Sequence, residues 1–448
     1  MKWDKYLNAN RVKGYSERDK QNDPRNEFES DFGRVIFSPA IRRMHDKTQV
    51  FPLTTDDNIH SRLTHSLEVM AIGYSLGLKL VENNEFIELS GLDKNKVLRE
   101  IPIILKNVCL VHDIGNPPFG HFGEEVIKNY FQKKFKTNNF GLDDKESEDF
   151  TKFDGNAQGF RVLTKLQVLD DAFGLNLTFA TLASYLKYPN PNAINKVKLS
   201  QKKRGVFQSE RKYLDIIAEG CDLKTQEGEY IRHPLSFLME AADSICYLVM
   251  DIEDGFNKGW YDFEKIKSIL GKLNGIGNIL ESADKKINRV SKIVNLRIGL
   301  IKYLVDLTIS NFIKYYESIC NGTYNQELIN DDENKVANTL LGICVSEIFP
   351  QKDIQFLELT GDSVISGLLD YYIEFLFHEN EDYRKRAIGL ISSSIIRASI
   401  LENKLGYNGK FEDLSNYYKL RVIADFITGM TDQYALNHFQ KLSGQKII

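Results

Sequence analysis

Apolar residues recur three and four positions apart along most of this chain, and this spacing limits the possible folds more than any other sequence feature. Such spacing places apolar side chains on one face of an α-helix. Only 10 prolines occur in 448 residues, which suits long helices because an internal proline removes a hydrogen bond and clashes with the preceding turn. Period-two alternation is scarce, although short strands near 48–53 or 226–232 remain open. The sequence therefore predicts an all-α protein.

The helical pattern begins at Ser38, after a polar segment at 1–35 that we expect to form a solvated arm. Helices are expected at 61–84, 98–112, 124–135, 157–187, 232–256, 262–282, 286–320, 334–347, 354–378, 380–403 and 411–440. Loops are expected at 115–123, 136–156 and 189–212, where glycine, proline or polar residues gather. No clean linker is visible, so residues 1–448 are expected to form one unit, with a core at about 34–260 and a helical C-terminal elaboration at about 261–448.

Composition narrows the class of protein. Lys and Arg total 58 against 62 Asp and Glu, a net charge of −4, which argues against a strongly cationic nucleic-acid coat or a polybasic membrane tail. The five cysteines form no CxxC pair, which favours reduced thiols over a disulfide framework or a zinc ribbon. The N-terminal segment has no apolar core of a signal peptide, and no apolar run is long enough to span a bilayer. We therefore expect a cytoplasmic protein.

Two segments carry residue types that bind divalent metal ions. His112 and Asp113 end an apolar helical pattern, LKNVCLVHDIGN, where burying both polar groups is costly unless something binds them. Upstream, His65 lies in SRLTHSLEV, three residues after Arg62 and on the same predicted helical face. Taken alone, the His112–Asp113 pair is more typical of a core histidine that is hydrogen-bonded to its neighbour than of a metal site.

The predicted helix at 232–256 brings further polar side chains to one face. At about 100° per residue, Glu240, Asp243, Tyr247 and Asp251 fall within a narrow arc, and apolar residues fill the opposite side. The narrow arc contains no lysine or arginine, whereas an ordinary solvated face mixes charges of both signs. This face is therefore a candidate for binding a metal ion and a ligand.

These segments together predict one open metal site. Its ligands would be two imidazole nitrogens and two carboxylates, from His65, His112, Asp113 and Asp243. Such a set leaves octahedral positions free for water and a substrate oxygen, unlike a closed structural zinc site. Just beyond the glycine- and proline-rich loop, His121 and Glu124 lie three residues apart, where a carboxylate can orient an imidazole for acid–base chemistry.

The arrangement of these motifs resembles a known family. The set of four metal-ligand candidates is similar to the HD superfamily of metal-dependent phosphohydrolases. Longer blocks resemble the deoxyguanosine triphosphate triphosphohydrolases (dGTPases), in that family's order from about Arg11 to Leu436: RVIFSPAIRRMHDKTQVFPL (34–53), SRLTHSLEV (61–69), VHDIGNPPFGHFGEE (111–125), FQSER (207–211), RHPLSFLMEAADSICYLVMDIEDG (232–255) and FITGMTDQYAL (426–436). The resemblance implies an HD-domain helical bundle core with additional C-terminal helices.

The resemblance also implies roles for individual residues. It implies metal ligands at His65, His112, Asp113 and Asp243, a catalytic pair at His121 and Glu124, a deoxyribose pocket at Gln49, Tyr247 and Asp251, and triphosphate contacts near Arg62, Lys187 and Arg211. Gln49 and Asp251 would hydrogen-bond the 3′-hydroxyl, and the Tyr247 ring would exclude ribonucleotides because a 2′-hydroxyl would meet apolar surface. Where this family more often has a second aspartate, the chain has Ser244.

The activity that the resemblance implies is metal-dependent hydrolysis of dGTP at the α-phosphorus, which yields deoxynucleoside and inorganic triphosphate. His121, oriented by Glu124, would activate the water or protonate the leaving 5′-oxygen, and the sequence leaves both roles open. The alternatives are an HD enzyme with another phosphate substrate, a non-catalytic nucleotide sensor or single-stranded DNA-binding protein, and a purely structural helical protein.

Cofactor and partners follow the same resemblance. One divalent ion per subunit is expected, and Mn²⁺, Mg²⁺, Fe²⁺ and Co²⁺ all suit two histidines and two carboxylates. A homo-oligomer, commonly a hexamer in this family, is implied. Single-stranded DNA is a further candidate partner because one loop is rich in cations: Lys196, Lys198, Lys202, Lys203, Arg204, Arg211 and Lys212. The sequence leaves open the base preference, the identity of the metal ion and regulation by a second nucleotide.

Overall fold

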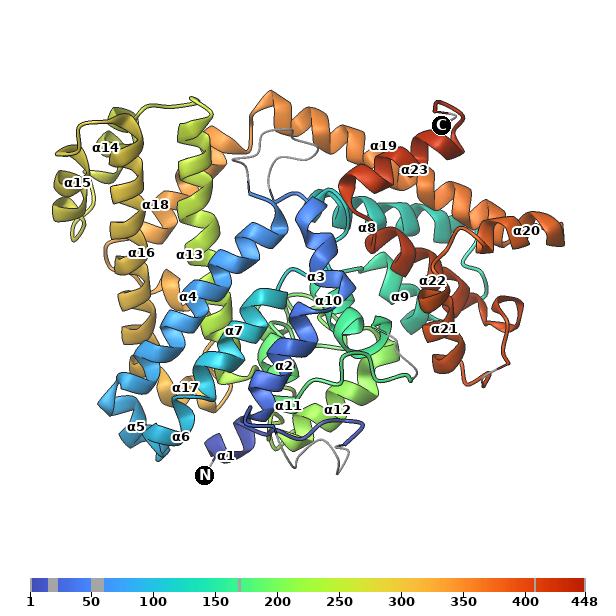
Figure 1. Cartoon of the computed structure of the whole chain (residues 1–448), viewed down its shortest axis with the longest axis horizontal. Helices are drawn as coiled ribbons and strands as arrows, with labels where there is room; N and C mark the ends of the chain where they lie inside the picture. Colours follow the sequence, from blue (N-terminus) through green and yellow to red (C-terminus); the bar gives the residue numbers. More distant parts are fainter. Residues whose placement is uncertain (1, 15–22, 50–59, 168–170, 407, 447–448) are drawn as a thin grey trace.

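The computed structural model describes residues 2–14, 23–49, 60–167, 171–406 and 408–446. Across these ranges the chain forms helices, and its β-type pairing consists of isolated bridges (Figure 1). The all-α prediction is confirmed. The possible strand at 226–232 is reduced to a single bridge between Lys224 and Tyr230, and most of 48–53 lies outside the described residues.

The α-helices of the N-terminal half are α1 (Lys2–Tyr6), α2 (Glu27–Ile36), α3 (Pro39–Arg43), α4 (Arg62–Glu82), α5 (Asn84–Ser90), α6 (Lys94–Val97), α7 (Ile101–Val111), α8 (Gly120–Thr137), α9 (Asp144–Thr151), α10 (Gly155–Arg161), α11 (Phe179–Tyr185), α12 (Arg211–Gly220) and α13 (Pro234–Asn257). Those of the C-terminal half are α14 (Phe263–Leu270), α15 (Gly277–Asp284), α16 (Arg289–Lys314), α17 (Tyr316–Cys320), α18 (Val336–Ile343), α19 (Lys352–Leu376), α20 (Glu381–Ile388), α21 (Ser393–Glu402), α22 (Asn416–Thr428) and α23 (Asp432–Leu442). Short 3₁₀ or π segments include η3 (Val162–Leu166), η5 (Gln208–Glu210) and η7 (Cys344–Ile348).

Helices α4, α7 and α13 pack against one another and form the frame of the molecule (Figure 1). The close approach of α4 to α7 depends on glycine, since a Cβ at Gly77 would lie 2.7 Å from the Cα of Pro102 and one at Gly73 would lie 2.3 Å from Cys109 Sγ. Apolar residues of α7 such as Leu105 and Val108 are fully buried between their neighbours. This packing brings the beginning of α4 beside the end of α7.

The N-terminal segment is not a solvated arm, and the prediction for residues 1–35 was wrong over their described part. Trp3 and Tyr6 are 1% and 0% exposed, and the Trp3 indole donates a hydrogen bond to the hydroxyl of Tyr316, 2.8 Å away. Arg11 forms a buried ion pair of 2.6 Å with Asp31 of α2. The sequence of this segment looks polar because charged residues outnumber the aromatic ones. A few aromatic side chains, Trp3 and Tyr6 among them, nevertheless pack into the interior and hold the segment there.

Several long helical predictions are broken in the structure. The range 157–187 contains the end of α10, the π segment η3 and α11, with an irregular stretch at 171–178. The range 380–403 is divided into α20 and α21. Conversely, the predicted loop at 136–156 contains α9, whose N-cap Asp143 forms a capping box with Glu146. Local capping thus created a helix that the weak hydrophobic periodicity did not indicate.

Two clusters of buried apolar residues form the interior. One contains most of α1–α7, α11–α13 and α14–α18, and the other contains α8, α9 and α19–α23 (Figure 1). Aromatic residues dominate the second cluster, where Phe131 packs on Phe150 with ring centroids 4.9 Å apart. Both clusters draw on residues before and after position 260, so the division proposed there stays a prediction.

A buried ion network connects the two clusters. The guanidinium of Arg161 at the end of α10 lies 2.7 Å from Glu210 Oε1, 2.8 Å from Glu402 Oε2 and 2.8 Å from Asp425 Oδ2. Arg421, four residues before Asp425 on α22, adds a contact of 3.1 Å to the same carboxylate. Because the Arg161, Glu210, Asp425 and Arg421 side chains are 0% exposed, their charges are compensated by one another and not by water.

None of the described helices is both long and apolar enough to cross a membrane. The five cysteines are unbonded and buried.

Candidate functional site

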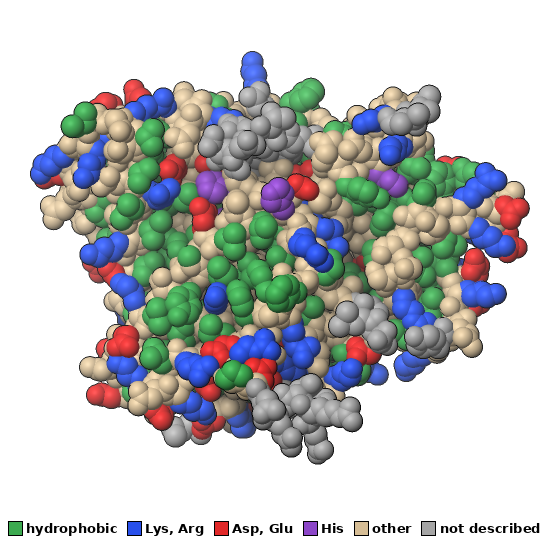
Figure 2. All heavy atoms as spheres, in the orientation of Figure 1, with side chains coloured by type: hydrophobic (Ala, Val, Ile, Leu, Met, Phe, Trp, Pro, Cys, Tyr) green, Lys and Arg blue, Asp and Glu red, His purple; other side chains and the backbone are tan. Residues whose placement is uncertain are grey.

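Three of the predicted metal ligands converge where α4 meets the turn after α7. Candidate ligand atoms of His65, His112 and Asp113 all lie within 4.8 Å of one another. Asp243 of α13 reaches the same point, with its Oδ1 3.2 Å from His65 Nε2 and 3.3 Å from His112 Nε2. His65 and His112 are 2% and 8% exposed, and few histidine atoms reach the surface of the face drawn in Figure 2. The structure therefore brings together the four residues that the sequence pattern selected.

The imidazole of His112 is oriented to bind an ion. Its Nδ1 donates a hydrogen bond of 2.7 Å to the carbonyl of Cys109, which leaves Nε2 unprotonated in the neutral ring. This Nε2 is buried and has no well-directed hydrogen bond within the described part of the chain. This nitrogen is buried, lacks a well-directed hydrogen bond among the described residues and faces two carboxylates. Such a mixed set of donors suits a divalent cation of intermediate hardness.

Electrostatics in this cluster keep the carboxylates ionised. Burial favours the protonated form of Asp113, but the Arg62 guanidinium and His112 outweigh it and lower the pKa of that carboxyl to about 2. Burial alone would lower the pKa of His112, yet Asp113 and Asp243 raise it to about 9. Two anionic carboxylates in a buried site attract a positive charge, which a proton or a metal ion supplies.

Asp113 is held by two side chains in addition to its place in the cluster. Its Oδ1 accepts a hydrogen bond of 2.7 Å from Asn116 Nδ2, and its Oδ2 pairs with Arg62 Nη1. Arg62 begins α4 and is buried, so its charge points into the site and not into solvent. The guanidinium expected near the triphosphate thus contacts a candidate metal ligand in this structure.

Glu124 and His121 lie close together, but only one of them is fixed. Glu124 is buried, and its carboxylate accepts hydrogen bonds from the Gly155 amide at 3.0 Å and from Lys128 at 2.8 Å. Lys203 lies 3.6 Å from the same carboxylate. His121 Nδ1 is 4.0 Å from Glu124 Oε2, and the His121 side chain is 77% exposed. Burial opposes ionisation of Glu124, but His121 and the two lysines hold its pKa far below the usual value.

The loop that joins these two groups is fixed by the C-terminal end of the chain. Phe119 adopts the left-handed conformation, with φ of +60°, which is costly for a bulky residue. Its amide donates a hydrogen bond of 3.0 Å to Asp432 Oδ1, at the start of α23, and Asp432 Oδ2 accepts one of 3.0 Å from the Thr48 amide. Lys47 Nζ donates to the carbonyls of Asn116 and Thr428, at 2.6 and 2.7 Å.

The polar face of α13 meets cations from other elements. Lys187, which follows α11, places its Nζ 3.2 Å from Glu240 Oε1, and Arg232 lies 2.8 Å from Glu240 Oε2. Glu240 and Arg232 are buried, so this face is interior and not a solvated surface. Lys187 also acts electrostatically on Asp243, which places it on the same side as the metal cluster.

The residues expected around the sugar lie on α13 and ahead of α4, the helices that carry Asp243 and His65. Tyr247 and Asp251 follow Asp243 at four-residue intervals on α13, and Asp251 is buried. Burial and the nearby Asp254 raise the pKa of Asp251 to about 8, so it is largely protonated at neutral pH. Gln49, before α4, has a buried Oε1 that finds no hydrogen-bond donor among the described residues. A protonated carboxyl and a free acceptor are suitable groups for binding a hydroxyl.

The cation-rich loop is less free than its composition indicated. Lys198 pairs with Glu229 at 2.8 Å, Lys203 with Asp154 at 3.1 Å and Arg204 with Glu148 at 3.1 Å. Arg211 is exposed at the first residue of α12, where its charge acts on Asp215 and Tyr230. None of the described contacts brings Arg211 to the metal cluster.

Three positions in the site were missed by sequence reasoning. Asn116 could have been predicted from the sequence, since it lies three residues after Asp113 and its amide can donate a hydrogen bond to that carboxylate. Lys203 was assigned only to a charged loop, and the fold carries it to Glu124. Glu327, which accepts a hydrogen bond of 3.1 Å from Ser244 Oγ, comes from a segment without a motif. No local signal marks the last of these, because only the tertiary fold places it there.

Comparison with known proteins agrees with this geometry. The HD domain family matches residues 62–159, and the phosphohydrolase-associated domain family matches residues 398–441. A deoxyguanosinetriphosphate triphosphohydrolase-like protein of Listeria monocytogenes is 34% identical, with 99% of this chain and 100% of the relative covered. The chain belongs to the dGTPase family of the HD superfamily. A Synechocystis dGTPase-like protein is 32% identical over 99% of both chains, and the deoxyguanosinetriphosphate triphosphohydrolase of Salmonella paratyphi A is 32% identical over 93% of both.

Membership of the dGTPase family makes the chain a hydrolase of the HD phosphohydrolase type. An HD domain implies a divalent metal ion, and the cluster of His65, His112 and Asp113 is a candidate site for it. The second matched family covers the second half of α21, all of α22 and most of α23, the segment that contains Asp425 and Asp432. In this structure the segment supports the loop after α7, because Asp432 accepts a hydrogen bond from the Phe119 amide.

Proposed function

We propose that the chain hydrolyses dGTP at the α-phosphorus and releases deoxyguanosine and inorganic triphosphate, with action on other deoxynucleotides left to experiment. The observation that carries the proposal is the meeting of His65, His112, Asp113 and Asp243 beside the His121–Glu124 pair. The named activity of the relatives supports the choice of substrate.

The ion and its ligands have separate tasks. His65, His112, Asp113 and Asp243 would hold one divalent ion, and Mn²⁺, Mg²⁺, Fe²⁺ and Co²⁺ each suit this set. When bound, such an ion supplies Lewis-acid polarisation of a phosphate oxygen. Asn116 keeps Asp113 in position through its hydrogen bond of 2.7 Å.

Acid–base chemistry falls to His121. Its exposed ring is free to reach a phosphate ester, and the ionised Glu124 at 4.0 Å stabilises the imidazolium. Two roles are open to the ring: it takes a proton from the attacking water, or it gives a proton to the leaving 5′-oxygen. Arg62 and Lys187 supply positive charge for the triphosphate, which Arg binds as a fork and Lys as a point charge.

Selection of deoxyribose would come from the α13 side of the site. The largely protonated Asp251 donates to the 3′-hydroxyl and Gln49 Oε1 accepts from it, while the half-buried Tyr247 ring packs against C2′. A 2′-hydroxyl would lose its hydrogen bonds to water against that ring without gaining a partner.

A product assay tests the proposal. The purified chain is incubated with dGTP, dATP, dCTP, dTTP or GTP and with Mg²⁺ or Mn²⁺, and products are separated by ion-exchange chromatography. Triphosphate and deoxyguanosine from dGTP would support the proposal, and triphosphate from all four deoxynucleotides would widen the substrate class. Orthophosphate or pyrophosphate would place the cut at another phosphorus and contradict it. The Asp113→Ala variant, purified in parallel, reports any contaminating phosphatase.

The assay also separates the competing functions. Turnover of a different phosphate ester, without any from deoxynucleotides, would indicate an HD enzyme of other specificity, and nucleotide binding without turnover would indicate a sensor. We further propose a homo-oligomer, with the hexamer as the expected form, and a cytoplasmic location. Analytical ultracentrifugation tests the oligomeric state. Three of the seven cations of the loop, Lys198, Lys203 and Arg204, are paired with carboxylates, which weakens the case for single-stranded DNA as a partner.

A further inference from the structure

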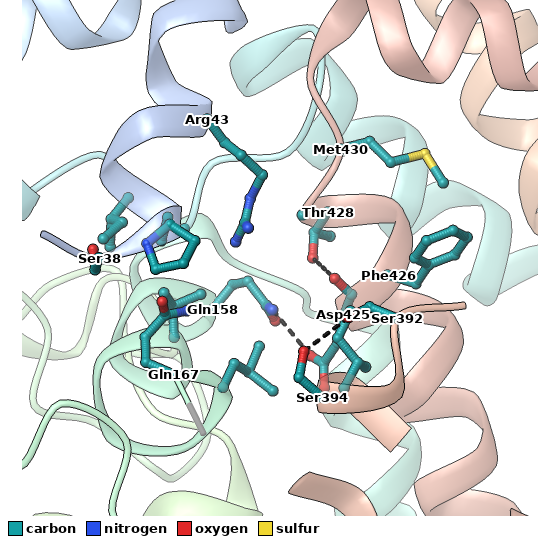
Figure 3. Close-up of a pocket in the computed structure, with 18 of the residues that line it drawn as sticks. Ser38, Arg43, Gln158, Gln167, Ser392, Ser394, Asp425, Phe426, Thr428 and Met430 are labelled. Atoms are coloured by element: carbon teal, nitrogen blue, oxygen red, sulfur yellow. Dashed lines mark hydrogen bonds between the residues drawn. The ribbon is translucent and has the colours of Figure 1, made fainter. Parts of the chain in front are cut away.

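A cavity of about 770 Å³ lies beside the turn at 114–115 that follows α7, and it is separate from the predicted metal ligands. It is enclosed by α3, the turn at 114–115, η3 and the C-terminal helices α21–α23. Figure 3 shows Arg43 extending from α3 into this space, opposite Thr428 and Met430. Among the described lining residues there is no candidate metal ligand and no predicted substrate contact.

The walls of this cavity are suited to an apolar body. Large apolar side chains line it from both sides: Phe37, Leu166, Leu175, Ile395, Phe426 and Met430. Its volume falls within the range of cavities that bind small organic molecules, which enclose most of the ligand's surface. Water gains little in such a space, because few polar groups are available to replace the hydrogen bonds of bulk solvent.

Positive charge is concentrated at one end of the cavity. Arg43 is half-buried and forms no ion pair with a carboxylate within the described residues. Lys47 is buried, and both of its described hydrogen bonds go to uncharged backbone carbonyls, of Asn116 and Thr428. Burial lowers the pKa of Lys47 to about 7, so Arg43 carries the lasting positive charge and a bound anion would favour the charged form of Lys47.

The negative charge in the lining is already neutralised. Asp425 is the one carboxylate among the described lining residues, and it is bound by Arg161 at 2.8 Å and Arg421 at 3.1 Å. Arg34 also lines the cavity, but it is exposed and donates a hydrogen bond to the Leu175 carbonyl at its edge. The excess positive charge inside the cavity therefore lies on Arg43 and the partly protonated Lys47. That excess matches one carboxylate far better than the four negative charges of a nucleoside triphosphate.

We propose that this cavity binds an apolar monocarboxylate, with its carboxylate on Arg43 and Lys47 and its hydrocarbon body among the apolar walls. The site is separate from the proposed hydrolysis and does not depend on it. Its occupant would contact Gly115 and Lys47, and Lys47 holds the backbone of Asn116, the residue that supports Asp113.

Calorimetric titration of the Mg²⁺-loaded chain tests this proposal with three probes: octanoate, octan-1-ol and acetate. Octanoate has both features, octanol lacks the charge, and acetate lacks the apolar body while reporting carboxylate binding to the metal ion. We expect octanoate to bind about tenfold or more tightly than octanol, because a hydrogen bond to a charged group contributes at least that factor. Acetate should produce no binding heat at the same concentrations.

Variants of the cavity locate the binding. Arg43→Met should weaken octanoate binding about tenfold or more and leave octanol unchanged, while the matched control Arg42→Met, at an exposed neighbour outside the cavity, should leave both within about twofold. Ser394→Trp, which fills the cavity from an exposed position, should abolish octanoate binding without endangering the fold.

Several results would overturn the proposal. Octanol binding as tightly as octanoate would show that charge has no part in recognition. Octanoate binding that survives both Arg43→Met and Ser394→Trp would place the ligand elsewhere. Absence of any octanoate heat in the parent chain would reject an apolar monocarboxylate as the occupant.

Discussion

At the scale of single residues, the site contrasts a fixed carboxylate with an exposed imidazole. Glu124 is held by the Gly155 amide and Lys128, whereas the His121 ring is 77% exposed and can turn toward a substrate. Fixing the charge and leaving the proton carrier mobile suits general acid–base catalysis, where the imidazole must reach an atom of the bound substrate. Asp113, by contrast, is restrained at both of its oxygens.

This contrast predicts different losses for two substitutions. His121→Ala should retain the bound metal and lower turnover by a factor of about 10² or more, because only proton transfer is removed. Asp113→Ala should lose metal and activity together, because a ligand is removed. Metal content by mass spectrometry and steady-state turnover measure both effects, and the exposed His378→Ala serves as a control. Loss of metal from His121→Ala would instead move that residue among the ligands.

A second prediction concerns Ser244, where the family more often has an aspartate. Ser244 Oγ donates to Glu327, whose pKa is raised by burial and by Glu240. Ser244→Asp should therefore place two carboxylates in contact and destabilise the fold by about 1–2 kcal/mol at neutral pH. Glu327→Gln should remove most of that loss in the double variant. Urea denaturation of the four proteins measures the coupling, and a coupling energy near zero would refute the explanation.

Residues that the sequence grouped by chemistry and spacing lie together in the fold, and their role as metal ligands stays a prediction. His65, His112, Asp113 and Asp243 were selected because a metal site needs those donor types, and the fold brings them together. Glu327 had no such signal, since a lone glutamate in a polar turn looks like any solvated residue. Arg211 shows the opposite case, where charge complementarity alone did not determine its position.

At the scale of secondary-structure elements, helix ends decide much of the arrangement. His233 caps α13, and its Nδ1 accepts hydrogen bonds from the Leu235 amide at 3.1 Å and the Ser184 hydroxyl at 3.0 Å. Its Nε2 donates to the Tyr6 carbonyl at 3.0 Å, which ties the N-terminal helix α1 to α13. These partners favour the neutral ring, since a proton on Nδ1 would break the bond from the Leu235 amide and force the Ser184 hydroxyl to accept in place of donating.

This cap predicts a pH dependence of stability. Burial lowers the pKa of His233 from 6.5 to about 4, although the Tyr6 carbonyl partly opposes it. The unfolded chain therefore binds the proton first, and the stabilisation is complete above pH 6.5 and falls as the pH drops toward 4, by up to about 3 kcal/mol. Denaturation midpoints between pH 7 and 4 should fall less steeply for His233→Gln than for the parent. The exposed His378→Gln should keep the parental slope, and an unchanged slope for His233→Gln would contradict the assignment.

Element boundaries show why part of the fold escaped prediction. Residues 157–187 have continuous helical periodicity, yet the π segment η3 and the turn at 171–178 interrupt it, because this stretch packs against several elements at once. Helix α9 had a readable signal in its Asp143–Glu146 capping box, but its polar composition resembled a loop. Helices α4, α7 and α13 were predicted well because apolar periodicity continues along each of them, although α7 and α13 are buried on most sides.

At the scale of the whole molecule, the Arg161 network joins parts that are far apart in sequence. Its guanidinium meets carboxylates from η5, α21 and α22, and Arg421 supplies a second positive charge at Asp425. Arg161→Met should destabilise the chain by about 3–5 kcal/mol, because the acids would remain buried without their cation. Thermal denaturation followed by circular dichroism tests this. The exposed Arg386→Met should change the midpoint little, and an equally small effect of Arg161→Met would contradict the role of the network.

The hydrogen bonds from Phe119 and Thr48 to Asp432 have a consequence for protein synthesis. A nascent chain that has reached residue 431 already contains His65, Asp243 and the other predicted site residues, but not the carboxylate that holds the strained Phe119 backbone. Synthesis proceeds from the N-terminus, so the support for the Phe119 backbone arrives only with the segment that contains Asp432. A chain truncated before that segment would carry the predicted metal ligands and His121 and still lack this support.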